Sequence, residues 1–262
     1  MIRAGVNGAT GRMGQMLMRL IDEDDGLQLA AAVERPDHPA LGQDAGTACG
    51  TGAYGVELTP ALPPGVDVLL DFSSPAGTMG QLPHCLEHGT AMVVGTTGLT
   101  PQQLGELNTA AAGIPMMVSP NMSVGVNLVF DVAAEIARRL GVDYDIEIVE
   151  AHHRFKKDAP SGTALRIAER IAGALGVSLD DCANYGREGQ VGERPTGQIG
   201  IHAVRGGDIV GDHTVIFATQ GERVELRHQA HSRETFVRGA IRAAKFIAGK
   251  PAGAYGMKDV LR

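Results

Sequence analysis

The sequence is poor in the residues that several classes of protein need. It has no tryptophan, only 4% aromatic residues in a length of 262, and a formal net charge of -7. A nucleic-acid-binding protein needs a basic face and aromatic stacking platforms, so this composition argues against a nucleic-acid partner. No apolar run approaches the roughly 18 residues of a transmembrane helix, and the first residues form a strand pattern rather than a secretion signal. We therefore expect a cytoplasmic protein with no membrane partner.

Cysteine is scarce as well. Cys49, Cys85 and Cys182 are odd in number and are never spaced as CxxC, which argues against a disulfide framework and a thiolate zinc site. His84 and His88 stand four residues apart, a spacing that metal ligands use on a helix. Because we find no third ligand beside them, we interpret both as helix residues that face solvent. The sequence therefore predicts no metal site.

The N-terminal segment combines a short strand, a glycine-rich turn and an amphipathic helix. An apolar strand pattern over residues 2–6 precedes glycines at positions 8, 11 and 14, and apolar residues at helical spacing follow. A second strand, over 27–33, leads to Glu34, about 20 residues beyond the last glycine. Glycines in such a turn allow positive φ and close approach of a pyrophosphate, and the acid accepts hydrogen bonds from the adenosine ribose. We predict a dinucleotide site; the alternative is a purely structural glycine turn.

Two neighbouring residues bear on the choice of dinucleotide. Glu34 suits the free ribose hydroxyls of NAD, whereas Arg35 suits the 2'-phosphate of NADP. The pair predicts that both NADH and NADPH are accepted as cofactors.

The strand patterns change character along the chain. Nearly continuous apolar runs over 66–72, 91–95 and 115–121 each precede a helical pattern, as in βα units of a parallel sheet covered on both faces. After Leu140, the segments 144–150, 199–205, 208–218 and 222–230 alternate instead, which is typical of a sheet with one wet face, and a last helix pattern covers 233–249. We predict an α/β protein: a Rossmann-type dinucleotide-binding domain from 1–123 and 232–262, and a second α+β domain, 124–231, with an open mixed β-sheet.

A cluster of cations lies in the second predicted domain, where the sequence reads EAHHRFKKDAPSGTA over 150–164. It places five potential cations in six positions: His152, His153, Arg154, Lys156 and Lys157. Gly162 and Thr163 then open an amphipathic helix, and the N–H groups of a helix N-terminus favour an anion. The arrangement predicts a site for a carboxylate; the alternative is a solvated basic run before a capped surface helix.

Two loops of the first predicted domain follow apolar strands. They are Gly95, Thr96 and Thr97, and Ser119, Pro120, Asn121 and Met122. Ligands of open parallel sheets bind at the carboxyl ends of the strands, so these loops either line the nicotinamide or are plain turns, and the sequence leaves both interpretations open.

Several motifs together resemble one enzyme family. They are GATGRMG, GTTG, SPNMSVGVN, EAHHRFKKDAPSGTA, RGGDIVGDH and SRETFVRGA. In combination they resemble the 4-hydroxy-tetrahydrodipicolinate reductases, also called dihydrodipicolinate reductases, and the resemblance spans nearly the whole chain. The most specific match falls on Glu150, His152, His153, Lys156, Pro160, Ser161, Gly162 and Thr163.

The resemblance implies a reaction and residue roles. The reaction is NAD(P)H-dependent reduction of 4-hydroxy-tetrahydrodipicolinate, through dihydrodipicolinate, to tetrahydrodipicolinate in diaminopimelate and lysine biosynthesis. It implies that His152 donates and accepts a proton, that Lys156 donates one, and that His153, Gly162 and Thr163 contact the cyclic dicarboxylate. The implied cofactor residues are Gly8, Ala9, Thr10, Gly11, Arg12, Met13, Glu34, Arg35, Gly95, Thr96, Thr97, Ser119, Pro120, Asn121 and Met122. A homotetramer joined through the sheet of the second domain is also implied.

Two other functions stay open from the residues alone. One is another two-domain NAD(P)-dependent dehydrogenase of a small carboxylate; a semialdehyde dehydrogenase would need a nucleophilic cysteine, and no cysteine lies in a motif-bearing loop. The other is a non-catalytic NAD(H)-sensing module, which would not need the cationic cluster.

Overall fold

The structure, a computed structural model, describes residues 1–261. The chain forms two compact units: the first comprises Met1–Val124 and the segment from Glu234 onward, and the second is Gly125–Arg233. The sequence places the two crossings within two residues of these positions. Each unit has its own sheet and its own core.

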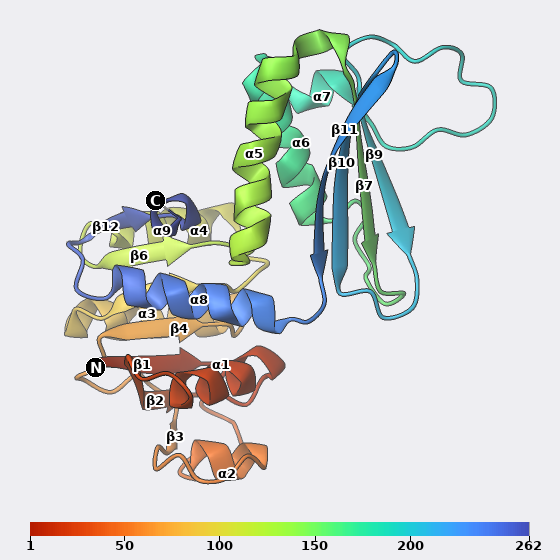
Figure 1. Cartoon of the computed structure of the whole chain (residues 1–262). Coiled ribbons are helices and arrows are strands. Elements are labelled where there is room, and N and C mark those ends of the chain that lie inside the picture. Colours follow the sequence, from red (N-terminus) through yellow and green to blue (C-terminus); the bar gives the residue numbers. More distant parts are fainter. Residues whose placement is uncertain (262) are drawn as a thin grey trace. The chain divides into compact units, whose positions relative to one another are not determined.

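The first unit contains a seven-stranded parallel sheet in the order β12-β6-β5-β4-β1-β2-β3 (Figure 1). Its strands are β1 (Ile2–Asn7), β2 (Leu27–Val33), β3 (Leu58–Thr59), β4 (Val68–Asp71), β5 (Ala91–Val94), β6 (Pro115–Val118) and β12 (Gly253–Tyr255). Its helices are α1 (Arg12–Asp22), α2 (Ala45–Cys49), α3 (Pro75–His88), α4 (Pro101–Ala110), α8 (Glu234–Ile247) and α9 (Met257–Val260).

Helices cover both faces of this sheet, which explains its continuous apolar strands. Val68 and Leu70 of β4 belong to a core cluster with residues of α1 and α8. Leu69, between them, belongs to a second cluster with residues of α3 and α4. Because successive side chains of a strand point to opposite faces, every position of β4 is buried.

The second unit contains a five-stranded mixed sheet in the order β11-β10-β7-β9-β8. Its strands are β7 (Asp145–His152), β8 (Ala183–Asn184), β9 (Ile199–Arg205), β10 (Gly211–Thr219) and β11 (Glu222–Ala230). The helices α5 (Val124–Leu140) and α6 (Gly162–Leu175) pack on one face, followed by the short α7 (Leu179–Cys182) (Figure 1). Strand β10 is antiparallel to β7 and β11, whereas β9 is parallel to β7 and β8.

One face of the mixed sheet is dry and the other is partly wet. Ile146 and Ile148 of β7 are buried against α5 and α6, whereas Glu147 and Val149 on the opposite face are half-buried. The prediction of a Rossmann-type unit plus a unit with an open mixed sheet is therefore confirmed.

The sequence reading missed the shortest elements and made two strands too long. Strand β12, of three residues, pairs with β6 at the edge of the sheet, and two or three residues show too little periodicity to be recognised. The expected strands 66–72 and 115–121 are four residues each: β4 begins only at Val68 and ends at Asp71, and β6 ends at Val118. No helix among residues 1–261 is long and apolar enough to cross a bilayer.

Candidate active site

The glycine turn between β1 and α1 has the geometry of an anion cradle. Gly8 has φ +78°, which favours glycine, and a Cβ on Gly14 would lie 2.1 Å from the Gly8 carbonyl oxygen. Gly11, the N-cap residue before α1, provides no side-chain cap. The first N–H groups of a helix have no intrahelical partner, so they are available to a phosphate group. The turn therefore fits the pyrophosphate of a dinucleotide.

The structure brings Glu34 onto this turn. Its Oε1 accepts hydrogen bonds from the Thr10 N–H at 2.9 Å and from Thr10 Oγ1 at 2.7 Å. Arg35, the next residue, instead pairs with Asp37 at 3.2 Å, and both side chains are exposed. Because an exposed ion pair contributes little, Arg35 is able to exchange Asp37 for another anion.

A buried polar cluster lies where β1, β4 and β5 end. Asp71 Oδ1 accepts hydrogen bonds from Asn7 Nδ2 at 3.0 Å, Ser73 Oγ at 2.5 Å and Thr96 Oγ1 at 3.3 Å. Burial raises the pKa of Asp71, although the bonds from Ser73 and Thr96 oppose the shift. Of the loop 95–97, Thr96 thus belongs to this cluster, whereas Thr97 is exposed. The sequence reading missed Asn7, Asp71 and Ser73, although polar residues directly after apolar strands are a usable signal.

The loop after β6 splits between a turn and the core. Ser119 Oγ donates to the Asn121 carbonyl at 2.8 Å, and Asn121 Oδ1 accepts from the Ser123 N–H at 3.0 Å. Met122 is buried in the cluster that includes α1 and α8. A ligand at this loop would therefore meet Ser119, Pro120, Asn121 and only the backbone of Met122.

In the second unit, Glu150 and His152 occupy the buried face of β7. The Glu150 side chain is fully buried, and its Oε2 accepts from His152 Nδ1 at 2.6 Å and from Arg205 Nη1 at 2.8 Å. Its Oε1 accepts from Arg205 Nη2 at 2.8 Å and from the Ser161 N–H at 3.0 Å. Burial acts to raise the pKa of Glu150, but the hydrogen bonds from Arg205, His152 and Ser161 outweigh it and lower the pKa. Glu150 is therefore a carboxylate that accepts four donors.

This carboxylate sets the tautomer of His152. A carboxylate only accepts, so His152 Nδ1 carries a hydrogen and Nε2 has the free lone pair when the ring is neutral. Burial lowers the pKa of His152; Glu150 opposes this, while the charges of Lys156 and Arg205 add to it. Nε2 lies close to Gly211, where an added Cβ would be 3.1 Å away. His152 is thus a neutral, oriented imidazole that can accept a proton.

The two lysines of the cationic cluster differ in the structure. Lys156 is mostly buried, and its Nζ pairs with Asp158 Oδ2 at 2.9 Å. The backbone carbonyl of Asp158 accepts from Arg205 Nη2 at 2.6 Å, which connects the lysine's loop to the His152 network. Lys157 is exposed.

The start of α6 lies beside the same network. Ser161 caps the helix by accepting from the Ala164 N–H, and its Oγ is 3.1 Å from His213 Nε2. Gly162, the first helical residue, is exposed, and Thr163 is half-buried. Burial lowers the pKa of His213 to about 4, and the charge of His152 adds to this. The ring of His213 meets that of His152 edge to face at 5.2 Å between centroids.

The remaining residues of the cluster face outward to different degrees. His153 is half-buried, and its Nδ1 has no hydrogen-bond partner among the residues described. Arg154 and Phe155 are exposed. The sequence motifs gave no role for Ser161, Arg205 or His213, although Ser161 lies in EAHHRFKKDAPSGTA and the other two lie in RGGDIVGDH.

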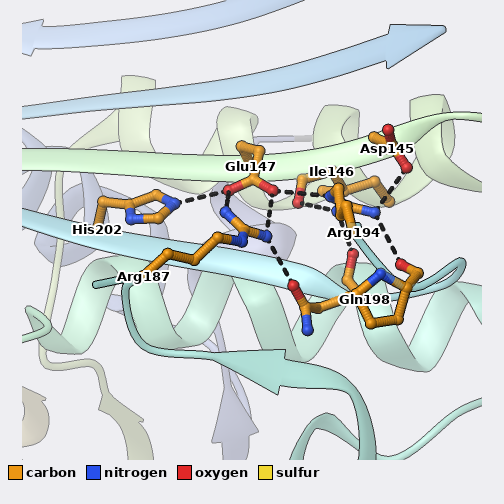
Figure 2. A network of polar contacts seen from close by, with 8 residues as sticks. Asp145, Ile146, Glu147, Arg187, Arg194, Gln198 and His202 are labelled. Carbon is orange, nitrogen blue, oxygen red and sulfur yellow. Dashed lines mark hydrogen bonds and ion pairs between the residues drawn. The ribbon is translucent and has the colours of Figure 1, made fainter. Parts of the chain in front are cut away.

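A second carboxylate network occupies the opposite face of β7 (Figure 2). Glu147 accepts from Arg187 Nη2 at 2.8 Å, from Arg194 Nε at 2.9 Å and from His202 Nε2 at 2.6 Å. Arg187 and Arg194 belong to the long connection between β8 and β9. This network therefore anchors a surface loop to the sheet.

The interpretation that no third ligand lies beside His84 and His88 is wrong. His84 and His88 do have a third potential ligand, because Glu87 lies with them in the last turn of α3, and one ligand atom of each lies within 4.8 Å of the others. Glu87 lies between the histidines in the sequence, and the helix brings its carboxylate to the same face as both rings.

Comparison with known proteins decides the family. Residues 2–122 match the family model described as "Dihydrodipicolinate reductase, N-terminus", and residues 125–261 match "Dihydrodipicolinate reductase, C-terminus". The chain belongs to the dihydrodipicolinate reductase family.

Individual relatives agree along the full length. The chain is 48% identical to a 4-hydroxy-tetrahydrodipicolinate reductase of Geobacter sp. (strain M21), covering 100% of this chain and 99% of that protein. It is 52% identical to the 4-hydroxy-tetrahydrodipicolinate reductase of Anaeromyxobacter sp. (strain Fw109-5), covering 100% of this chain and 98% of that protein. The structure of a dipicolinate-bound dihydrodipicolinate reductase from Paenisporosarcina sp. TG-14 matches with a TM-score of 0.75 and 25% identity, covering 98% of this chain and 97% of that chain. A probable dehydrogenase from Thermotoga maritima, at 12% identity and a TM-score of 0.61, shares the fold.

Proposed function

We propose that His152 and Lys156 move the protons in this family's reaction. The chain is an NAD(P)H-dependent oxidoreductase that reduces 4-hydroxy-tetrahydrodipicolinate to tetrahydrodipicolinate in diaminopimelate and lysine biosynthesis. The observation that carries the residue assignment is the buried Glu150, which orients His152 in the unit that also holds Lys156.

The substrate is a cyclic dicarboxylate, and the second unit has the groups to hold it. We assign its carboxylates to His153, Gly162 and Thr163. Cationic side chains and the N-terminus of α6, a 14-residue helix, both favour negative charge. The unpartnered Nδ1 of His153 supports a ligand at that ring.

Each proton-transferring side chain has a distinct task. His152, neutral and with a free Nε2, takes a proton from the ring carbon next to the one that bears the hydroxyl and returns it to the departing hydroxide, so that water leaves and dihydrodipicolinate forms. Hydride addition at one ring carbon leaves an enamine, and Lys156 donates a proton from Nζ to the neighbouring enamine carbon. Asp158 holds Lys156 until a substrate carboxylate replaces it. General acid–base catalysis by such groups contributes about 10² to 10⁴ in rate.

The first unit is the nucleotide domain in this proposal. A bound nicotinamide dinucleotide supplies the hydride. The glycine turn from Gly8 to Met13 holds its pyrophosphate, Glu34 accepts from the ribose, and the loops 95–97 and 119–122 face the nicotinamide half. Arg35 leaves Asp37 for the 2'-phosphate when NADPH binds, so NADH and NADPH are both cofactors.

A homotetramer and a cytoplasmic location complete the proposal. The face of the mixed sheet away from α5 and α6 carries half-buried apolar side chains, Val149 and Ile216 among them, and Val204 is 47% exposed. Such a face suits a subunit contact, and sedimentation velocity of the purified protein tests it. In the cytoplasm the enzyme has access to reduced nicotinamide cofactor.

The deciding experiment compares two adjacent lysines. Purified protein receives NADPH or NADH and substrate generated by the preceding synthase, and turnover is followed at the nicotinamide absorbance. We expect Lys156→Ala to lower kcat by about 10² to 10⁴, because it removes a positioned acid. Lys157→Ala, one position along, should only weaken electrostatic attraction of the substrate.

Two results would contradict the proposal. No turnover by the wild-type protein would favour a nucleotide-sensing module. Equal losses in the two variants would show that the cationic cluster acts as a diffuse anion patch, without a single proton donor.

A further inference from the structure

The motif RGGDIVGDH, over 205–213, supplies no residue to the proposed chemistry, yet its first residue, Arg205, contacts Glu150 and Asp158, which bind His152 and Lys156. Arg205 is the last residue of β9, and the strand register places it opposite His152, the last residue of β7. Both side chains lie on the buried face of the sheet with Glu150. Arg205 is 20% exposed, so its guanidinium is largely enclosed by the groups that it binds.

The first connection runs to His152. Arg205 binds both carboxylate oxygens of Glu150 at 2.8 Å, and Glu150 binds His152 Nδ1 at 2.6 Å. A two-point contact between guanidinium and carboxylate fixes the plane of the carboxylate as well as its charge. The imidazole is therefore held at the angle that this plane dictates.

The second connection runs to Lys156. Arg205 Nη2 also donates to the backbone carbonyl of Asp158 at 2.6 Å, and the Asp158 side chain pairs with Lys156 Nζ at 2.9 Å. One guanidinium thus bridges the strand that carries His152 and the loop that carries Lys156.

We propose that Arg205 is a positioning residue that holds both proton-transferring groups, His152 through Glu150 and Lys156 through Asp158. The proposal rests on the roles proposed above for His152 and Lys156. A residue that supports a reacting group in this way contributes about 10- to 100-fold to activity.

Arg194 is a matched control on the other face of β7 (Figure 2). It is 18% exposed, binds Glu147 at 2.9 Å and Asp145 at 2.6 Å, and reaches the Ile146 carbonyl at 3.0 Å. Its burial and its bonds to carboxylates and a carbonyl match those of Arg205, but it binds neither Glu150 nor Asp158, the partners of the proposed catalytic residues. The change in kcat on replacing Arg194 therefore measures the effect of removing a partly buried, carboxylate-bound arginine that positions no catalytic residue.

The test measures kcat for Arg205→Gln and Arg194→Gln in the wild-type, His152→Ala and Lys156→Ala backgrounds. We expect Arg205→Gln to lower kcat about 10- to 100-fold in the wild type. The loss should be smaller in each of the other two backgrounds, because a positioning residue has less to act on once its target is gone. Arg194→Gln should change kcat by the same factor in all three.

A second readout needs no turnover. The ¹⁵N shifts of the imidazole nitrogens report which one carries hydrogen. We expect it on Nδ1 in the wild type, and on either nitrogen in Arg205→Gln, where the Glu150 carboxylate, without its two-point contact, is free to turn away from Nδ1. If the wild-type protein shows no turnover, the proposed function is refuted. The ¹⁵N shifts would still test whether Arg205 positions His152 through Glu150. A folded Arg205→Gln with wild-type kcat and an unchanged tautomer, or an equal loss in every background, would overturn the proposal.

If Arg205→Gln does not fold, two variants that each disturb only one of the two connections still test the proposal. Asp158→Asn, at a side chain 61% exposed, cuts only the ion pair with Lys156 and should lower kcat about 2- to 5-fold. Arg205→Lys keeps the charge but loses the two-point contact, so the His152 tautomer should again become mixed. An unchanged kcat in the first and an unchanged tautomer in the second would overturn the proposal.

Discussion

Replacing Glu150 by glutamine tests how far the carboxylate controls His152. Glutamine has nearly the same shape, but it offers one accepting oxygen where Glu150 offers two. Four donors now converge on the carboxylate: two from Arg205, one from His152 and one from the Ser161 backbone. The amide nitrogen must therefore face at least one donor, and His152 can relieve the conflict by moving its hydrogen to Nε2.

That tautomer no longer accepts a proton at Nε2. In the serine protease triad, exchange of the orienting aspartate for asparagine costs about 10⁴ in kcat for this reason. We expect Glu150→Gln to lower kcat by about 10² to 10⁴, and by no more than His152→Ala, because the change acts through that ring.

The same substitution also affects stability. Breaking a buried ion pair costs about 3 to 5 kcal/mol, and the partial exposure of Arg205 places the loss near 3 kcal/mol. Because the pKa of Glu150 is lowered below 4.5 on folding, the carboxylate stabilises the fold above that pH and loses this contribution as pH falls through its folded value. In Glu150→Gln, this part of the fall in folding stability at low pH should be absent.

Glu147→Gln separates the effect on kcat from the effect on folding stability. Glu147 also binds arginines and a histidine, on the opposite face of β7 (Figure 2). It should lower the melting temperature while kcat stays near the wild-type value. Measurement of kcat and the melting temperature for both variants decides the question: if folded Glu150→Gln keeps a kcat within about threefold of Glu147→Gln, the tautomer argument is wrong.

Three further predictions concern the cofactor, the substrate and pH. NADH and NADPH should bind within about tenfold of each other, roughly 1.4 kcal/mol, by calorimetry, and Arg35→Ala should weaken NADPH selectively; a hundredfold preference in the wild type would contradict a shared role of Glu34 and Arg35. Pyridine-2,6-dicarboxylate should inhibit competitively, and a monocarboxylate analogue should bind about 1.5 to 3 kcal/mol more weakly; equal inhibition would rule out two carboxylate contacts. Because the pKa of His213 falls from 6.5 to about 4 on folding, the unfolded chain takes up a proton first, so stability should fall by about 3 kcal/mol from pH 6.5 to 4. His213→Gln should flatten this part of the melting-temperature profile, and an unchanged profile would refute the assignment.

The sequence predicted the elements whose patterns are long. The glycine turn with its helix, the alternating strand β7 and the amphipathic α6 all lie where periodicity and spacing put them. The elements that it missed, such as β3 and β12, have two or three residues and form through pairing with neighbouring strands. Their formation depends on contacts that no local pattern records.

The candidate site was predicted in part. The sequence singled out the cationic residues, but it treated Lys156 and Lys157 as alike in charge and separated them only by resemblance. Their difference in burial and in ion pairing arises from the loop after β7. Likewise, the link from Arg205 to Glu150 spans 55 residues and depends on the parallel register of β9 on β7.

Strand β7 nevertheless carries a signal for the site that the sequence could have given. Its buried face reads Ile146, Ile148, Glu150 and His152, so the apolar series ends in two polar residues at positions that should be dry. A charged group is rarely buried unless it is paired, so Glu150 requires a cation and hydrogen-bond donors from other elements. Departure from the strand's own pattern thus indicates where strand, loop and helix start must converge, which is the place where the proposed proton transfer occurs.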